Sequence, residues 1–113
     1  MSFRFVGHGA PGTFQLNGEK INAAHFANCH FVSRLQSLVE AAPCVELLSC
    51  RVALGDVGRD FVRTFARAVG KPVFASSKYV GPASRGGTYV LDFGYCPKTD
   101  KDLDGYQAAP VEG

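Results

Sequence analysis

Two short motifs in this sequence carry residue types that can do covalent chemistry, Gly7-His8-Gly9 and Ser49-Cys50. A cysteine thiol becomes a useful nucleophile when it is partly exposed and favoured as thiolate, and a nearby imidazole provides that environment. The backbone N–H groups of Gly9 and Cys50 could then stabilise a tetrahedral oxyanion, because a glycine lets backbone approach a substrate carbonyl closely. We therefore take His8 and Cys50 as a candidate catalytic dyad, and Gly9 and Cys50 as its candidate oxyanion hole.

The strands expected around these motifs place both motifs at strand ends. Residues 3–6 alternate and are β-prone before Gly7 breaks the strand, and residues 45–48 form a short strand that ends at Ser49-Cys50. Further strands are expected over 73–75 and 88–93, and turn signals over 10–18 predict a hairpin excursion beside the histidine.

Two helices separate these strands. Apolar residues at helical spacing predict a helix of about five turns over 22–41, with Asn22 as N-cap. Asp56 can cap a second helix, which Gly70 and Pro72 end.

Strands that alternate with helices predict an α/β fold with a mostly parallel sheet flanked by helices, because right-handed crossovers join parallel strands. Parallel strands deliver their carboxyl ends to one rim, where open α/β sheets bind ligands. His8 and Cys50 are expected on that rim. We predict one domain over residues 1–96, and a flexible C-terminal tail with little to bury over 97–113.

The order of these motifs resembles a known family. A strand, Gly7-His8-Gly9, a helix, and then a strand ending at Cys50 resemble the caspase-like (clan CD) cysteine peptidases. Residues 5–9 look like the self-processing protease domains of large clostridial and multifunctional RTX toxins. Four further stretches are similar to an uncharacterised domain of large bacterial adhesin and hemolysin-type proteins: residues 8–12, 16–18, 50–55 and 73–77.

The resemblance implies a partial caspase-like core, over residues 3 to about 91, and a function as a cysteine endopeptidase or self-processing domain. Cys50 would attack a peptide carbonyl and His8 would protonate the leaving amine, without a third carboxylate. Ser76 and Ser77, in the loop 76–87, would help to shape the substrate pocket. Full family domains carry more elements before the histidine strand, so the chain looks N-terminally short: a fragment, a compact variant that pairs with another chain, or a remnant without activity.

Composition bounds the alternatives. With 113 residues, 46% of them apolar, the chain is typical of an ordinary globular domain. The net charge of +2 and the scattered basic residues argue against nucleic-acid and membrane partners. The resemblance implies a peptide or protein substrate instead. An exposed sheet edge makes self-association an expectation. Without a signal peptide or membrane-spanning run, we expect a cytoplasmic protein, or an effector or toxin part released by a non-classical route.

The patterns that could indicate a metal site are incomplete, and we predict neither a bound metal nor a cofactor. His25 and Cys29 stand four residues apart, with His30 beside them, but two further ligands at suitable spacing are missing. Asp100, Asp102 and Asp104 match only the opening of a calcium loop. Cys29, Cys44 and Cys96 are expected to be structural, and all four cysteines free thiols.

Non-catalytic, structural roles for Cys50 and His8 remain as alternatives to the catalytic interpretation. Cys50 could be a small buried hydrophobe, and His8 a turn residue bonded to backbone. The chain would then be a non-catalytic interaction or targeting module that keeps the caspase-like scaffold. Three arginines at helical spacing on the second helix fit an ordinary exposed face: Arg59, Arg63 and Arg67.

Overall fold

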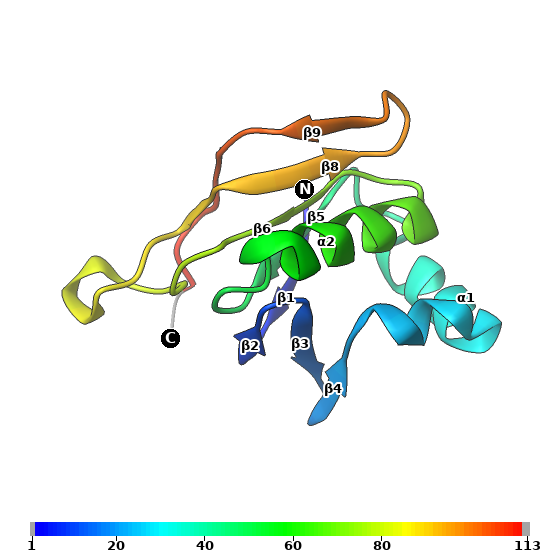
Figure 1. The fold of residues 1–113 in the computed structure, drawn as a ribbon, viewed down its shortest axis with the longest axis horizontal. Helices are drawn as coiled ribbons and strands as arrows, with labels where there is room; N and C mark the ends of the chain where they lie inside the picture. Colours follow the sequence, from blue (N-terminus) through cyan, green and yellow to red (C-terminus); the bar gives the residue numbers. More distant parts are fainter. Residues whose placement is uncertain (1, 112–113) are drawn as a thin grey trace.

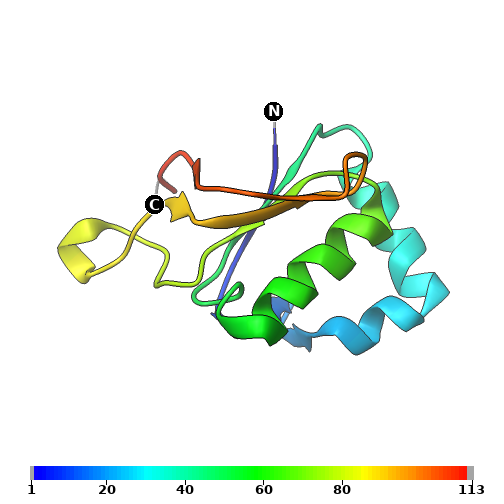
Figure 2. The same ribbon diagram turned by 45° about the horizontal axis from the view of Figure 1, so that its top comes forward.

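The computed structural model describes residues 2–111, in which two α-helices cover one face of a five-stranded sheet (Figures 1 and 2). The strands lie in the order β1 (Phe3–Val6), β5 (Val45–Leu48), β6 (Val73–Ala75), β8 (Phe93–Cys96) and β9 (Lys101–Leu103). Helix α1 (Cys29–Val39) connects β1 to β5, and α2 (Gly55–Val69) connects β5 to β6. Two successive right-handed crossovers in one direction place both helices on the same face.

The sheet is mixed, so the predicted mostly parallel sheet is only partly correct. Strands β1, β5 and β6 are parallel, whereas β8 pairs antiparallel with β6 and β9 antiparallel with β8. The reason is the connection: β8 follows β6 through a loop rather than a crossover helix, and a loop can return the chain in the opposite direction.

The main core lies between the sheet and the two helices. Phe5, Leu47 and Val73 point from the sheet toward α2, which buries Phe61 and Phe65 against them. A small antiparallel sheet closes one end of this core, formed by β2 (Gly9–Ala10), β3 (Thr13–Leu16) and β4 (Glu19–Ile21). Its Phe14 is fully buried between Phe5 and Phe65.

The helix predicted over 22–41 is two elements, a 3-10 helix η1 (Ala23–Ala27) and α1. Asn28 separates them, because its backbone is extended and its side chain accepts the N–H groups of His30 and Phe31 as the cap of α1. Asn22 caps η1 as predicted. For α2 the C-cap Gly70 is confirmed, with φ 70°, but the N-cap is Leu54, and Asp56 lies in the first turn.

The opposite face of the sheet carries a second, smaller cluster of Leu48, Leu91 and Ala108. Two short strands build it, β7 (Val90–Leu91) and β10 (Tyr106–Gln107), which pair antiparallel. The predicted strand over 88–93 is therefore divided, with β7 on this face and β8 in the main sheet. The 3-10 turn η2 (Ala83–Arg85) lies in the loop that precedes β7.

A buried carboxylate holds the C-terminal segment against this face. Glu46 accepts hydrogen bonds from Ser2, from Arg4 at 2.9 Å and from the Tyr106 hydroxyl at 2.6 Å. Residues 97–113 were expected to have little to bury, and here the structure differs: this segment provides β9 and β10, and Ala108 is buried. Alternation within short strands gave too weak a signal to reveal them.

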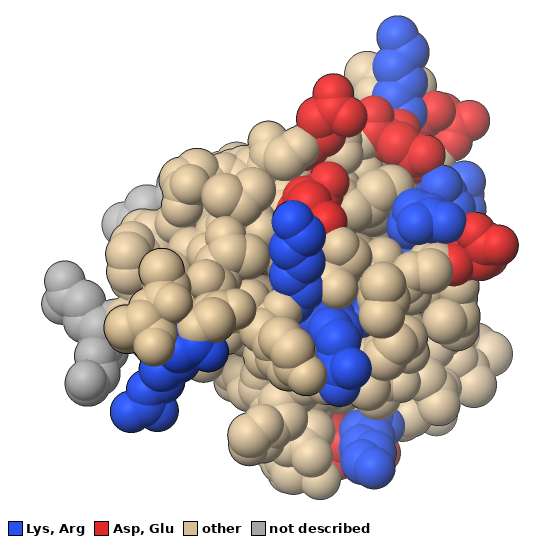
Figure 3. Space-filling model, turned by 60° about the vertical axis from the view of Figure 1, so that its left-hand side comes forward, with Lys and Arg blue, Asp and Glu red and all other residues tan. Residues whose placement is uncertain are grey.

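The surface charges are distributed rather than concentrated. On the face in Figure 3, basic side chains occupy several separate places and acidic side chains adjoin some of them. None of the helices within residues 2–111 has the length and apolar character needed to cross a bilayer.

Candidate functional site

Both predicted site motifs follow neighbouring parallel strands. Val6 at the end of β1 pairs in register with Leu48 at the end of β5, so Gly7-His8 and Ser49-Cys50 leave the sheet side by side. The strand-end placement expected for His8 and Cys50 is therefore found, and their catalytic roles stay a prediction.

The two loops touch at Gly9. A Cβ atom built there would lie 2.8 Å from the Cys50 carbonyl oxygen, 2.8 Å from the Ser49 Cβ and 2.9 Å from the Val52 Cγ2. Real Cβ atoms do not approach other heavy atoms so closely, so this contact requires glycine. The histidine loop thus packs directly on the backbone of the cysteine loop.

The two candidate oxyanion donors are unused by the surrounding backbone. The Gln15 N–H donates to the His8 carbonyl at 3.0 Å, which makes Gly9 and Phe14 a non-hydrogen-bonded pair of the β2–β3 ladder. The Gly9 N–H therefore points away from β3. For the Cys50 N–H, no backbone acceptor is found within residues 2–111.

His8 is exposed and lines a cavity of about 290 Å³ at the hairpin, together with Thr13, Gln15 and Lys20. Its ring makes no hydrogen bond within the part of the chain that the structure describes. The imidazole is thus accessible from solvent.

Cys50 is half-buried, and its sulfur contacts the loop that follows β6. The Val80 N–H donates to Sγ across 3.4 Å, and Sγ lies 3.9 Å from the Val80 carbonyl oxygen. The sulfur thus contacts both the N–H and the carbonyl of one residue. The same contact places Val80 over the Cys50 sulfur.

Backbone hydrogen bonds hold the Cys50 turn to this neighbouring loop. Arg51 and Ala53 donate to the carbonyls of Lys78 and Ser76, at 2.9 and 3.0 Å. Arg51 has a φ of 60°, in the left-handed region that disfavours side chains, and its guanidinium lies 5.0 Å from the centre of the Tyr79 ring. The sharp turn after Cys50 is thus fixed from the β6 side.

The predicted pocket residues Ser76 and Ser77 use their polar groups in hydrogen bonds inside the protein. Ser76 is fully buried and its hydroxyl accepts the Lys78 N–H at 2.9 Å. Ser77 donates both its N–H, at 2.7 Å, and its hydroxyl to the Asp92 carboxylate. Their role in substrate binding stays a prediction.

Sequence reasoning missed Asp92, which precedes β8. Because β8 is antiparallel to β6, with Phe93 opposite Ala75, its beginning lies at the rim where β1, β5 and β6 end. One signal was available: an aspartate is unfavourable inside a strand, so its place within the predicted strand 88–93 indicated a break and a specific partner.

Several of the residues considered for metal binding have other side-chain partners. His25 contacts Glu19 at 3.4 Å and caps η1. Asp102 pairs with Arg63 at 2.9 Å, and this guanidinium lowers the pKa of the carboxyl group. Among the described residues, no three His, Cys, Asp or Glu side chains come together as a metal site.

The other three thiols differ in environment, and all four cysteines are free. Burial, together with the nearby charge of Glu46, raises the pKa of Cys44. Hydrogen bonds from Thr99 lower the pKa of Cys96, which lies at the end of β8. A labelling experiment on Cys50 must therefore distinguish modification of Cys50 from modification of Cys96.

Comparison with protein families matches residues 1–108 to a domain of unknown function, DUF4347. The chain belongs to the DUF4347 family. The DUF4347 match includes the rim with His8 and Cys50, and also residues 97–108, which the sequence had placed in a tail. Comparison with curated proteins and with solved structures gave no match to this DUF4347 chain.

Proposed function

We propose that this DUF4347 chain is a cysteine peptidase with a caspase-like core, in which Cys50 is the nucleophile and His8 the general acid and base. One observation carries the proposal: the loops with the two residues follow adjacent parallel strands and touch where Gly9 packs on Cys50. Two helices on one face of three parallel strands also agree with the core that the sequence resemblance implied.

The reaction uses the residues of this rim. The Cys50 thiolate attacks the carbonyl carbon of a peptide bond, and the N–H groups of Gly9 and Cys50 stabilise the oxyanion. The C–N bond breaks as His8 gives its proton to the leaving amine. Water then hydrolyses the thioester with His8 as base, which releases the acid and restores the thiol.

Substrate binding requires a movement of the loop 76–87, because Val80 contacts the Cys50 sulfur. Gly81 and Gly86 in this loop have positive φ values, 153° and 79°, and the conformational freedom of glycine lets the loop change shape. The substrate is a peptide or protein segment, including a segment of the same polypeptide in a self-processing domain.

A competing proposal rests on the same contact. If the loop stays closed over the sulfur, the chain is a non-catalytic interaction or targeting module on this scaffold. The two proposals differ in whether His8 activates Cys50, and an experiment on thiol reactivity separates them.

The test is alkylation of Cys50 by iodoacetamide at neutral pH in a variant with Cys29, Cys44 and Cys96 changed to serine. Removal of Cys96 is necessary, because its lowered pKa makes it a reactive background thiol. We expect His8→Ala to slow the modification of Cys50 by about tenfold or more, the effect of losing a thiolate-stabilising partner.

His30→Ala is the matched control, since His30 is exposed on α1 and only its backbone N–H has a partner in the helix cap. It should leave the rate unchanged. If the intact chain alkylates Cys50 no faster than the same chain in denaturant, or if His8→Ala has no effect on a folded protein, the peptidase proposal is lost and the module is favoured.

A further inference from the structure

We propose that the free edge of β1, with the groove beside it, binds an extended peptide segment that presents apolar side chains and a carboxylate. This surface is independent of the peptidase proposal, because it lies along β1 and α1 rather than over Cys50. The occupant would add a strand to the sheet next to β1.

The first observation is the set of unpaired backbone groups on β1. The N–H groups of Phe3 and Gly7 face β5 and donate to the carbonyls of Cys44, just before β5, and Leu48, at its end, across 2.9 and 3.5 Å. Alternation along a strand then directs the N–H and C=O groups of Arg4 and Val6 away from β5, to the free edge. No backbone partner for these four groups occurs within residues 2–111.

The second observation is a groove along this edge that is lined by both apolar and polar side chains. A cavity of about 340 Å³ lies between β1 and the end of β3 and is lined by Phe5, Leu16 and Leu38 among others. A second cavity, of about 390 Å³, shares Leu16 and Leu38 and continues to Phe31 on α1. Leu38 is 48% exposed on the helix side of β1, and Val6 is 60% exposed on the other face. An added strand would cover both.

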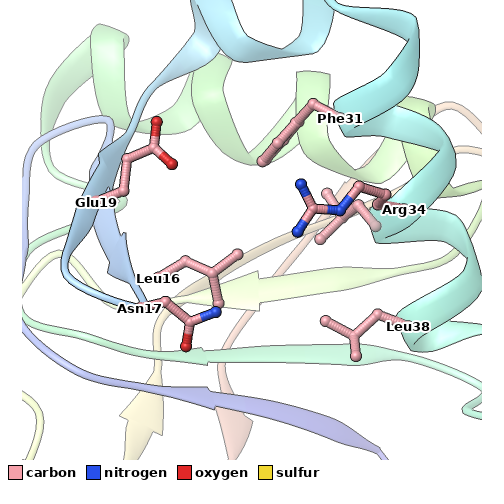
Figure 4. A pocket seen from close by; sticks show the side chains of 7 residues that line it. Leu16, Asn17, Glu19, Phe31, Arg34 and Leu38 are labelled. Carbon is pink, nitrogen blue, oxygen red and sulfur yellow. The ribbon is translucent and has the colours of Figure 1, made fainter.

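The third observation is one guanidinium directed into this groove. Figure 4 shows Arg34 reaching from α1 into the cavity, toward the side where Leu16, Asn17 and Glu19 lie. Over the described residues Arg34 has no ion pair or side-chain hydrogen bond, whereas Glu19 contacts His25. An exposed guanidinium that reaches over apolar side chains favours a carboxylate carried by an apolar segment.

A second copy of this chain does not fit as the occupant, because its β1 would bring no negative charge to Arg34. The strand that a second copy would pair, β1, has the sequence Phe-Arg-Phe-Val and brings no carboxylate to Arg34. An added strand presents alternate side chains to one face, so the segment that fits has an acidic residue flanked, two positions away on each side, by apolar residues.

The test is fluorescence anisotropy with the probe peptide Thr-Val-Thr-Glu-Thr-Val-Thr, labelled with fluorescein, and its lysine analogue Thr-Val-Thr-Lys-Thr-Val-Thr. We expect the glutamate probe to bind and the lysine probe to bind about fivefold to tenfold more weakly, the range for a partly exposed charge contact replaced by repulsion. Arg34→Glu should reverse the preference. Arg85→Glu, an exposed arginine in η2, should not change it.

Backbone pairing is tested by N-methylation of alternate amides in the glutamate probe. Loss of binding supports strand addition, and undiminished binding overturns it. No binding of either probe at millimolar concentration, or equal binding of both, overturns the proposal. So does a dimer in sedimentation equilibrium that Val6→Lys and Leu38→Lys dissociate, since a second copy would then be the occupant.

Discussion

Substitution of Gly9 by alanine tests the contact on which the candidate site depends. The added Cβ would meet three atoms at 2.8–2.9 Å, two of them in Ser49 and Cys50. Ordinary contacts of a Cβ begin near 3.4 Å, so each of the three has to open by several tenths of an ångström. Two of the atoms belong to backbone or Cβ positions, which cannot rotate away.

Overpacking of this kind destabilises a protein by about 1–3 kcal/mol. For a domain of this length, 1 kcal/mol corresponds to a change in Tm of about 4 °C. We therefore expect Gly9→Ala to lower Tm by about 4–12 °C. The histidine loop should also move away from Cys50, so the substitution should slow alkylation of Cys50 in the variant with no other thiol.

The assay is thermal unfolding for Tm and urea unfolding for the free energy, both followed by far-UV circular dichroism, with equal m-values in urea as the condition for comparison. Gly7→Ala is the matched control, because its Cβ would meet only the Gln15 carbonyl oxygen, at 3.3 Å. Neither glycine has a left-handed φ, so backbone strain does not distinguish the two. If both substitutions change the free energy of unfolding equally, the two loops are not packed as described and the dyad geometry has no support.

Three further predictions concern other parts of the fold and the turn after Cys50. Lys71 donates to the carbonyls of Val39, Glu40 and Ala42 at the end of α1, at 2.5–2.7 Å. Lys71→Met should therefore lower the free energy of unfolding in urea by about 1–2 kcal/mol. Lys71→Arg keeps a cationic donor and should lower this free energy by less. Because Arg51 has a left-handed φ, the free energy of unfolding of Arg51→Gly should exceed that of Arg51→Ala by about 1 kcal/mol. Equal free energies would show that the backbone of the turn after Cys50 is not strained. The hydrogen bond to Glu46 raises the pKa of Tyr106 to about 12, above its unfolded value, so the folded state keeps this proton longer and stability is lost as pH rises from about 10 to 12. Tyr106→Phe should unfold with a smaller pH dependence in that interval, and an unchanged dependence would contradict the assignment.

Local pattern predicted much of the architecture. The bounds of β1, β5 and β6, the Gly70 cap of α2, and the side-by-side placement of the two motifs follow from alternation, helical spacing and capping. Asn28 was the exception, because its cap breaks a helical pattern that the apolar residues alone would continue.

Other features depend on contacts between residues far apart in the sequence. The partner of a strand too short to show alternation is set by packing, so β9 and β10 could not be predicted from residues 97–107. The contact of Val80 with Cys50, and of Asp92 with Ser77, joins loops that only the sheet brings together.

The sequence by itself thus determined which residue types stand at the ends of β1 and β5, since strand and turn propensities act over a few neighbouring residues. Only the tertiary structure decided how those ends meet, with Gly9 on Cys50 and Val80 over the sulfur. Such contacts arise from the direction of β8 and the packing of loops across the sheet, which no local pattern records.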